Sequence, residues 1–260
     1  MFHVEHLNSL RLAELDFLRG YLPPQSADLL EIGAGTGRQG LELRKLGHRV
    51  EMIDLASSNY VHERLCEITD YDGRRIPFDN ATFDVVYSSN VLEHVADLTT
   101  LHAEIRRVLR PGGYAIHLVP THHWRLWSSV AAFPAAAQHA YSLRRDLLPR
   151  STSRADVART AAAWVTMARS LASPFVQRRH GERGNVLSEV LLFRPARWRR
   201  HFAENGFRIL HESPAQLFYT GSMVMGPRWS MERRRGLAHV LGSACELFVV
   251  APDPTPQHIR

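Results

Sequence analysis

The sequence predicts an α/β fold in which a doubly wound, mostly parallel sheet carries a helical insert after its fifth strand. One observation is local: a short apolar strand, Asp28–Ile32, runs into a glycine-rich turn, a helix at Gln39–Leu46 and a second strand at His48–Ile53. This succession is typical of a βαβ unit. The other observation is global, since apolar strands and amphipathic helices keep alternating downstream, as they do in sheets with helices on both faces.

Each further element has its own signal. Leucines at helical spacing predict a helix over residues 9–22, which Pro23 and Pro24 terminate. Residues Val61–Ile68 are expected to form a short helix or strand. A helix at Leu98–Leu109 ends at Pro111-Gly112-Gly113, because these residues cannot continue it. The remaining apolar runs predict buried strands at Phe83–Ser88, Tyr114–Val119, Phe207–Glu212 and Glu246–Ala251.

The segment after the fifth strand departs from this alternation. Residues Trp124–Leu148 and Thr160–Phe175 are rich in Ala, Leu and Trp and predict helices. We interpret the chain as one domain over 1–260, with a cofactor-binding core at 9–120, a helical insert or lid at 121–190, closing strands at 191–251 and an unstructured tail at 252–260. Aromatic residues of the insert, Trp124, Trp127 and Phe133, belong either to the core or to an apolar wall of the acceptor site.

Composition narrows the class of protein. The 260 residues are 45% hydrophobic and 22% charged, and no apolar run has the length of a membrane span or a secretory signal. The expected location is therefore the cytoplasm. Cys66 and Cys245 lie far apart, so we expect buried thiols and no metal site. The net charge of +6 arises mainly in the second half, where arginines form either a solvated face or a contact with a membrane surface through the insert.

The glycine turn carries the first chemical signal. Its residues Gly33, Gly35 and Gly37 follow Glu31, and Asp54 ends the next strand. Glycine tolerates positive φ and lets a ligand approach the backbone, while a carboxylate at Asp54 suits two ribose hydroxyls. A nicotinamide dinucleotide site uses a similar turn, but its pattern requires glycine where Arg38 stands. The spacing therefore favours a nucleoside without a pyrophosphate, such as S-adenosylmethionine.

Five stretches in order resemble the class I S-adenosylmethionine-dependent methyltransferases. They are LLEIGAGTG, the acidic Asp54, the Asp72-Gly73 stretch with its IPF turn, FDVVYSSNVLEHV and RVLRPGG. The resemblance is to the small-molecule branch that includes the ubiquinone O-methyltransferases. It implies a Rossmann-like sheet of seven strands and S-adenosylmethionine as cofactor. The second half, from His180 to the closing GSACELFVV, more loosely resembles methyltransferases encoded among surface-polysaccharide genes.

The resemblance also implies roles for individual residues. Gly33, Gly35 and Gly37 would line the methionine moiety, with Glu31 ahead of them, and Asp54 would hold the ribose. Asp72 would accept from the adenine amino group, with the Gly73 backbone beside it and Asp70 as the alternative acceptor. Asn90, at the end of the fourth strand, would enclose the bound cofactor from that side.

Histidines are the candidate general bases, because an imidazole titrates near neutrality. His122 and His123 follow the fifth strand, at the carboxyl edge where ligands of such sheets bind. His94 follows the fourth strand. Each has a structural alternative, a helix or loop residue without a role in catalysis. His180, with Glu182 and Glu189, forms a further polar group expected near the same cleft.

The predicted function is methyl transfer to a hydroxyl on a glycan, glycolipid or small metabolite. A small-amine N-methyltransferase is one alternative, and a non-catalytic methyltransferase-like binding protein is another. Methylation of nucleic-acid bases is disfavoured, because Ser88-Ser89-Asn90-Val91 lacks the Asn/Asp-Pro-Pro-aromatic tetrapeptide of those enzymes. Cytosine C5 chemistry also requires a nucleophilic cysteine, and neither cysteine is placed for it.

Overall fold

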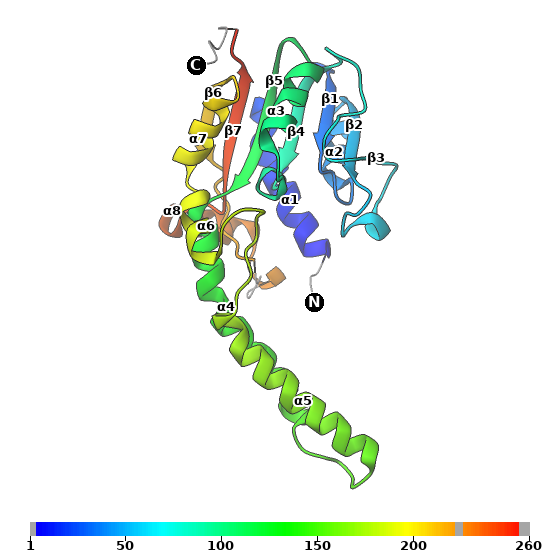
Figure 1. The fold of residues 1–260 in the computed structure, drawn as a ribbon, viewed down its shortest axis with the longest axis vertical. Helices are drawn as coiled ribbons and strands as arrows, with labels where there is room; N and C mark the ends of the chain where they lie inside the picture. The colour runs from blue at the N-terminus through cyan, green and yellow to red at the C-terminus, as the bar shows by residue number, and fades with distance from the viewer. Residues whose placement is uncertain (1–3, 222–225, 255–260) are drawn as a thin grey trace.

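A computed structural model of the chain describes residues 4–221 and 226–254. Its centre is a seven-stranded sheet with the strand order β3-β2-β1-β4-β5-β7-β6 (Figure 1). Strands β1 to β5 run parallel, whereas β7 pairs antiparallel with both β5 and β6. The predicted doubly wound, mostly parallel sheet of seven strands is confirmed.

The strands alternate with helices along most of the chain. The strands are β1 (Asp28–Ile32), β2 (Arg49–Leu55), β3 (Thr69–Tyr71), β4 (Phe83–Ser89), β5 (Leu109–Pro120), β6 (Phe207–Pro214) and β7 (Cys245–Pro252). The α-helices are α1 (Val4–Leu18), α2 (Arg38–Lys45), α3 (Leu98–Val108), α4 (His122–Ser142), α5 (Arg154–Ala172), α6 (Val186–Leu192), α7 (Pro195–Glu204) and α8 (Met231–Leu241). Short 3-10 turns include η2 (Val61–Glu63) and η3 (Leu92–His94).

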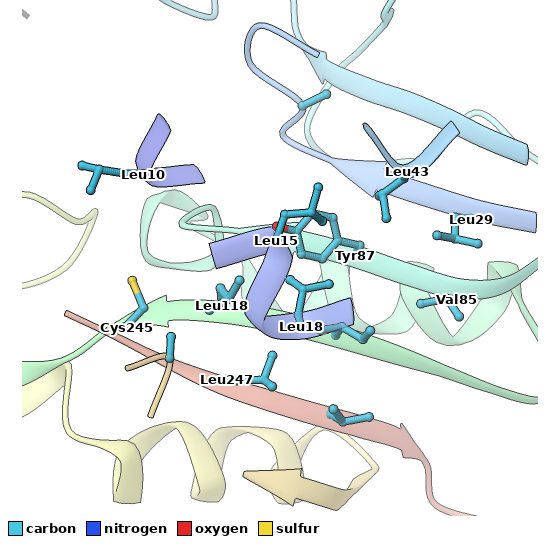
Figure 2. Packing of buried hydrophobic residues seen from close by; sticks show 14 of the residues in the cluster. Leu10, Leu15, Leu18, Leu29, Leu43, Val85, Tyr87, Leu118, Cys245 and Leu247 are labelled. Atoms are coloured by element: carbon cyan, nitrogen blue, oxygen red, sulfur yellow. The ribbon is translucent and has the colours of Figure 1, made fainter. Parts of the chain in front are cut away.

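Alternating side chains of the strands divide the core into two layers. One layer joins Leu29, Val85 and Leu118 of the sheet to leucines of α1 and α2 (Figure 2). The other joins Leu30, Val86 and neighbouring residues to α3 and α7. Because successive strand residues point to opposite faces, a continuous apolar strand such as β1 fills both layers.

One predicted element is shorter than expected. Of the short helix or strand predicted at Val61–Ile68, only the 3-10 helix η2 forms, and the third strand begins after this segment, at Thr69. Strand β3 spans three residues at the sheet edge, and Thr69 and Asp70 are exposed, so it has no apolar pattern that a sequence could reveal. The predicted tail falls largely on residues 255–260, outside the described residues, and β7 continues to Pro252.

The stretch between β5 and α7 is helical, as predicted. Helices α4 and α5 form a long hairpin whose far end projects away from the sheet, while the start of α4 and α6 lie close to it (Figure 1). The boundaries of the insert and its service as a lid stay predictions. Among the described residues, no helix combines the length and apolarity needed to cross a membrane.

Candidate functional site

The glycine turn joins β1 to α2 with three residues in the left-handed region. Gly33, Gly35 and Gly37 have φ values of 71°, 57° and 77°. The turn is fixed to the neighbouring strand, because the Gly33 and Ala34 amides both donate to the Ile53 carbonyl, at 2.8 and 3.1 Å. A side chain at any of the three positions would strain the backbone.

The surroundings of the three glycines differ. A Cβ at Gly33 would lie 2.4 Å from Val91 Cγ2, and one at Gly37 would lie 2.7 Å from Cys66 Sγ. At Gly35 the nearest atom is Cδ2 of the Tyr60 ring, at 3.4 Å, an ordinary contact distance. Internal packing therefore requires glycine at positions 33 and 37, whereas at position 35 the backbone conformation alone requires it. Tyr60 is a neighbour of the turn that sequence reasoning missed, because it follows β2 without any motif.

Asp54 lies against this turn, where the sequence predicted it. The Gly35 amide donates to Asp54 Oδ2 at 3.1 Å, and the Leu55 amide donates to Oδ1 at 2.8 Å. The side chain is only 8% exposed. Each carboxylate oxygen accepts one hydrogen bond here and has capacity for another, so the group is oriented and still able to bind hydroxyls.

Glu31 is turned toward helix α2. Its carboxylate oxygen Oε2 lies 2.5 Å from the place where a Cβ of Gly40 would stand, and the residue is 3% exposed. Burial, together with the charge of nearby Asp54, raises the pKa of Glu31 to about 8.

Asp72 and Gly73 form a turn after β3. The Asp72 carboxylate accepts from the Arg74 and Arg75 amides at 2.8 and 2.9 Å, and these bonds lower its pKa. Gly73, with φ of 76°, lies beside Leu55, the residue after Asp54. The predicted ribose and adenine contacts are thus neighbours. The alternative, Asp70, is held by Arg64 at 2.7 Å.

Asn90 follows β4 in a left-handed conformation, with φ of 54°. Its amide nitrogen Nδ2 donates to Ser89 Oγ at 3.2 Å, and its oxygen accepts from Cys245 Sγ at 3.3 Å. The next residue, Val91, packs over Gly33. The chain leaving β4 therefore contacts the glycine turn through Val91, while the Asn90 side chain is directed to β7.

His94 ends the turn η3 and pairs with a residue of the insert. Its ring lies edge-on to that of His180, with 4.6 Å between the centroids, and its Nε2 is 3.7 Å from Glu93 Oε1. Burial lowers the pKa of His94. His180, in turn, contacts Trp124, so the structure brings His94, His180 and the first turn of α4 together.

His122 and His123 are the first residues of α4, and their ring centroids lie 3.9 Å apart with the planes tilted by 36°. Burial lowers the pKa of both. His123 packs on Gly242 near the start of β7, and Nδ1 of His122 is buried without a hydrogen bond from the described residues. Both histidines lie at the carboxyl edge of the sheet, where the sequence predicted them. They form a pair with each other, whereas His94 forms a separate pair with His180.

The group around His180 is more ordered than the sequence indicated. Glu189 Oε1 accepts from the His180 and Gly181 amides at 2.6 and 2.7 Å, and Arg125 Nε lies 3.4 Å from Glu189 Oε2. Sequence reasoning named Glu189 but missed Arg125, which appears on α4 as one arginine among many. Of the three aromatic residues, Trp124 is buried, Trp127 donates to the Leu241 carbonyl, and Phe133 is half exposed.

Comparisons with known proteins agree with this geometry. Residues 30–117 match the family model described as a methyltransferase domain. This segment therefore resembles a class I methyltransferase domain, and it contains the glycine turn, Asp54, Asp72, Asn90 and His94. The methyl donor that this resemblance implies is S-adenosylmethionine.

The curated relatives align with this chain over only part of their own length. The malonyl-[acyl-carrier protein] O-methyltransferase of Xylella fastidiosa (strain M23) is 30% identical over 42% of this chain and 40% of its own. The ubiquinone biosynthesis O-methyltransferase of Xanthomonas oryzae pv. oryzae (strain PXO99A) is 30% identical over 56% of this chain and 62% of its own. This chain therefore covers less than two thirds of either relative.

Solved structures share the whole fold at low identity. The S-adenosylmethionine-dependent methyltransferase from Mesorhizobium loti aligns with a TM-score of 0.52 and 17% identity, over 92% of this chain and 97% of its own. The likeness is one of fold, which in this chain is a seven-stranded Rossmann-like sheet with an antiparallel β7.

The residues at the turn fit this methyl donor. The atoms nearest to an added Cβ at Gly35 belong to the Tyr60 ring, and the Asp54 carboxylate, which accepts from the Gly35 amide, keeps acceptor capacity for hydroxyls. A sulfonium nucleoside carries no negatively charged pyrophosphate. The Asp54 carboxylate at the glycine turn would therefore not repel it and can accept hydrogen bonds from its ribose.

Proposed function

We propose that the chain is a methyltransferase that transfers the methyl group of S-adenosylmethionine to a hydroxyl of a glycan, a glycolipid or another small metabolite. The observation that carries this proposal is the contact between the Gly35 amide and Asp54 within a turn of three left-handed glycines. When bound, S-adenosylmethionine supplies an electrophilic methyl group, and the protein positions the acceptor.

Two features support a hydroxyl acceptor. Two of the relatives with matching segments are O-methyltransferases, a malonyl-[acyl-carrier protein] O-methyltransferase and a ubiquinone biosynthesis O-methyltransferase. Histidines with lowered pKa lie at the carboxyl edge of the sheet, and neutral imidazoles are suited to accept a hydroxyl proton. We assign the role of base to His122 or His123, which follow β5 at the carboxyl edge of the sheet.

Calorimetric titration with S-adenosylmethionine tests the cofactor half of this proposal. Binding with one site per chain is expected, and an absence of binding favours the non-catalytic alternative. A methyl-transfer screen over sugar, quinol and amine acceptors tests the other half. Turnover confined to amines would replace the hydroxyl assignment with N-methylation.

We also propose that the α4–α5 hairpin rests on an anionic membrane surface, which suits a lipid-linked acceptor. Large apolar side chains are exposed along it, including Phe175 at 77%, Leu148 at 73% and Tyr141 at 65%. Arg144 stacks over the Tyr141 ring at 3.7 Å, so cationic and aromatic groups are mixed as they are at lipid interfaces. Flotation with vesicles containing phosphatidylglycerol is expected to retain the protein at physiological salt, and a protein left at the bottom of the gradient would end this proposal.

A further inference from the structure

The turn η3 and a loop of the insert meet at a cluster of three ligand-type side chains. Glu93 Oε1 lies 3.7 Å from His94 Nε2 and 3.8 Å from His180 Nε2. One ligand atom from each residue lies within 4.8 Å of the other two. Two imidazoles and one carboxylate are a donor set that zinc and similar divalent transition ions accept.

The Glu93 carboxylate supplies an independent reason to expect a cation. Its side chain is fully buried, and neither oxygen accepts a hydrogen bond from the described residues. A buried carboxylate without hydrogen bonds costs free energy unless a positive charge compensates it. The ring nitrogens of His94 and His180 lie 3.7 and 3.8 Å from it and can bind a cation jointly with the carboxylate.

The protein holds His180 in this place through buried contacts. Glu189 accepts from the His180 and Gly181 amides and is itself paired with Arg125. On the other side, the Glu182 amide donates to the Glu93 carbonyl at 2.9 Å. Gly181 lies so close that a Cβ there would approach this carbonyl to 2.7 Å. The loop is thus docked on η3 from both sides, and the His180 ring packs against Trp124.

We propose that Glu93, His94 and His180 bind one divalent transition-metal ion, with Zn²⁺ as its representative. Ligand atoms about 2.1 Å from a tetrahedral ion lie about 3.4 Å apart. The distances of 3.7 and 3.8 Å from Glu93 to the two histidines therefore need shifts of a few tenths of an ångström, and the two histidine ligand atoms lie within 4.8 Å of each other. Both histidines are partly exposed, at 44% and 34% of their side chains, which gives an ion access. The site departs from the sequence-based expectation of no metal.

Its use rests on the proposed function. Three protein ligands leave a coordination position open, and an acceptor hydroxyl bound there would be polarised and easier to deprotonate. Glu93 also lines a small pocket of about 60 Å³ together with Trp198 and His201 of α7. The acceptor class that this site selects is a molecule with a metal-binding oxygen next to the methylated hydroxyl.

Metal binding can be measured without any turnover. The full chain, stripped with a chelator, is titrated with Zn²⁺, with Co²⁺ as a spectroscopic probe of histidine ligation, and with Mg²⁺ as a hard-cation control. We expect one Zn²⁺ per chain, visible Co²⁺ absorption bands, and no binding of Mg²⁺ at the same concentrations. His180→Asn and Glu93→Gln should each weaken Zn²⁺ binding at least 100-fold, while His62→Asn, on the turn η2 far from the cluster, should leave it unchanged.

Two results would overturn the proposal: no stoichiometric Zn²⁺ in the parent protein, or equal affinity in His180→Asn and the parent. Circular dichroism of each variant checks that it folds, and His180→Asn replaces a partly exposed side chain. A parallel titration with S-adenosylmethionine separates the two proposals. Zn²⁺ binding without cofactor binding removes the methyltransferase function and leaves the metal site, and the converse removes only the metal site.

Discussion

The turn between β1 and α2 and the loop docked on η3 are two parts of the carboxyl edge that are built in different ways. The turn is a local structure, since its glycines, the Asp54 contact and the bonds to Ile53 all lie within one βαβ unit. The docked loop is assembled from α4, η3 and residues 180–189, which are far apart in the chain. A local structure is specified by residue types at fixed spacing, whereas an assembled one depends on the tertiary packing of every contributing element.

Substitution of a glycine in the turn between β1 and α2 should have the largest effect on the free energy of unfolding. Gly33→Ala places a Cβ 2.4 Å from Val91 Cγ2 at a φ of 71°. We expect a loss of about 2–4 kcal/mol in the free energy of unfolding, since left-handed strain and overpacking each cost about 1–2 kcal/mol. Urea denaturation measures the change.

The matched control is Gly236→Ala in α8, where nothing lies within 4 Å of an added Cβ. It should raise stability by about 0.5–1 kcal/mol, because alanine is the better helix former. Equal effects of the two substitutions would show that the turn is not the constrained element described above.

Loss of the Asp54 carboxylate should reduce cofactor binding without unfolding the protein. We expect Asp54→Ala to weaken S-adenosylmethionine affinity by about 1.5–3 kcal/mol, the contribution of hydrogen bonds to a charged group. Isothermal titration gives the value. Asp146→Ala, which removes only a partner of Arg150 and Arg159 on the α4–α5 hairpin, serves as the control and should retain the parent affinity. An unchanged Asp54→Ala protein would remove the ribose contact from the account.

The buried Glu31 predicts a pH dependence of stability that originates at the turn. Its folded pKa of about 8 is raised above the unfolded value, so its contribution is complete below pH 4.5 and is lost as the pH rises toward 8. Glu246, raised to about 7 by burial, acts in the same direction. Buried His102, whose pKa burial lowers to about 3, acts oppositely, but only below pH 6.5.

Between pH 6.5 and 8 the two glutamates therefore decide the sign, and the unliganded protein should become less stable. Thermal unfolding across this range measures the slope. Glu31→Gln should flatten most of it, and Glu246→Gln a smaller part. A slope unchanged in Glu31→Gln would show that the carboxyl is already ionised beneath the turn.

The smallest effect is expected on the hairpin surface. Phe175 is 77% exposed and contacts Phe133 at its edge, so Phe175→Ser should change the free energy of unfolding by no more than about 0.5 kcal/mol. Chemical denaturation tests this. A larger loss would mean that the α4–α5 hairpin is held by a contact across its apolar face.

The contrast also explains what the sequence could predict. The βαβ unit, Asp54 beside the turn and the helical stretch after β5 follow from spacing and periodicity alone. Strand β3 could not be predicted in this way, because its three residues lie at the sheet edge, are partly exposed and show no alternation of apolar and polar side chains. The approach of His180 to Glu93, and the pairing of Arg125 with Glu189, depend on how the insert folds back, which no local pattern encodes.

The most direct test of the account is a crystal structure of the protein with S-adenosylhomocysteine, the demethylated product of the cofactor. We expect the nucleoside to bind over Gly35, with its ribose hydroxyls donating hydrogen bonds to the Asp54 carboxylate. A ligand bound elsewhere, or a turn that instead accepts a nicotinamide dinucleotide under the same conditions, would contradict it.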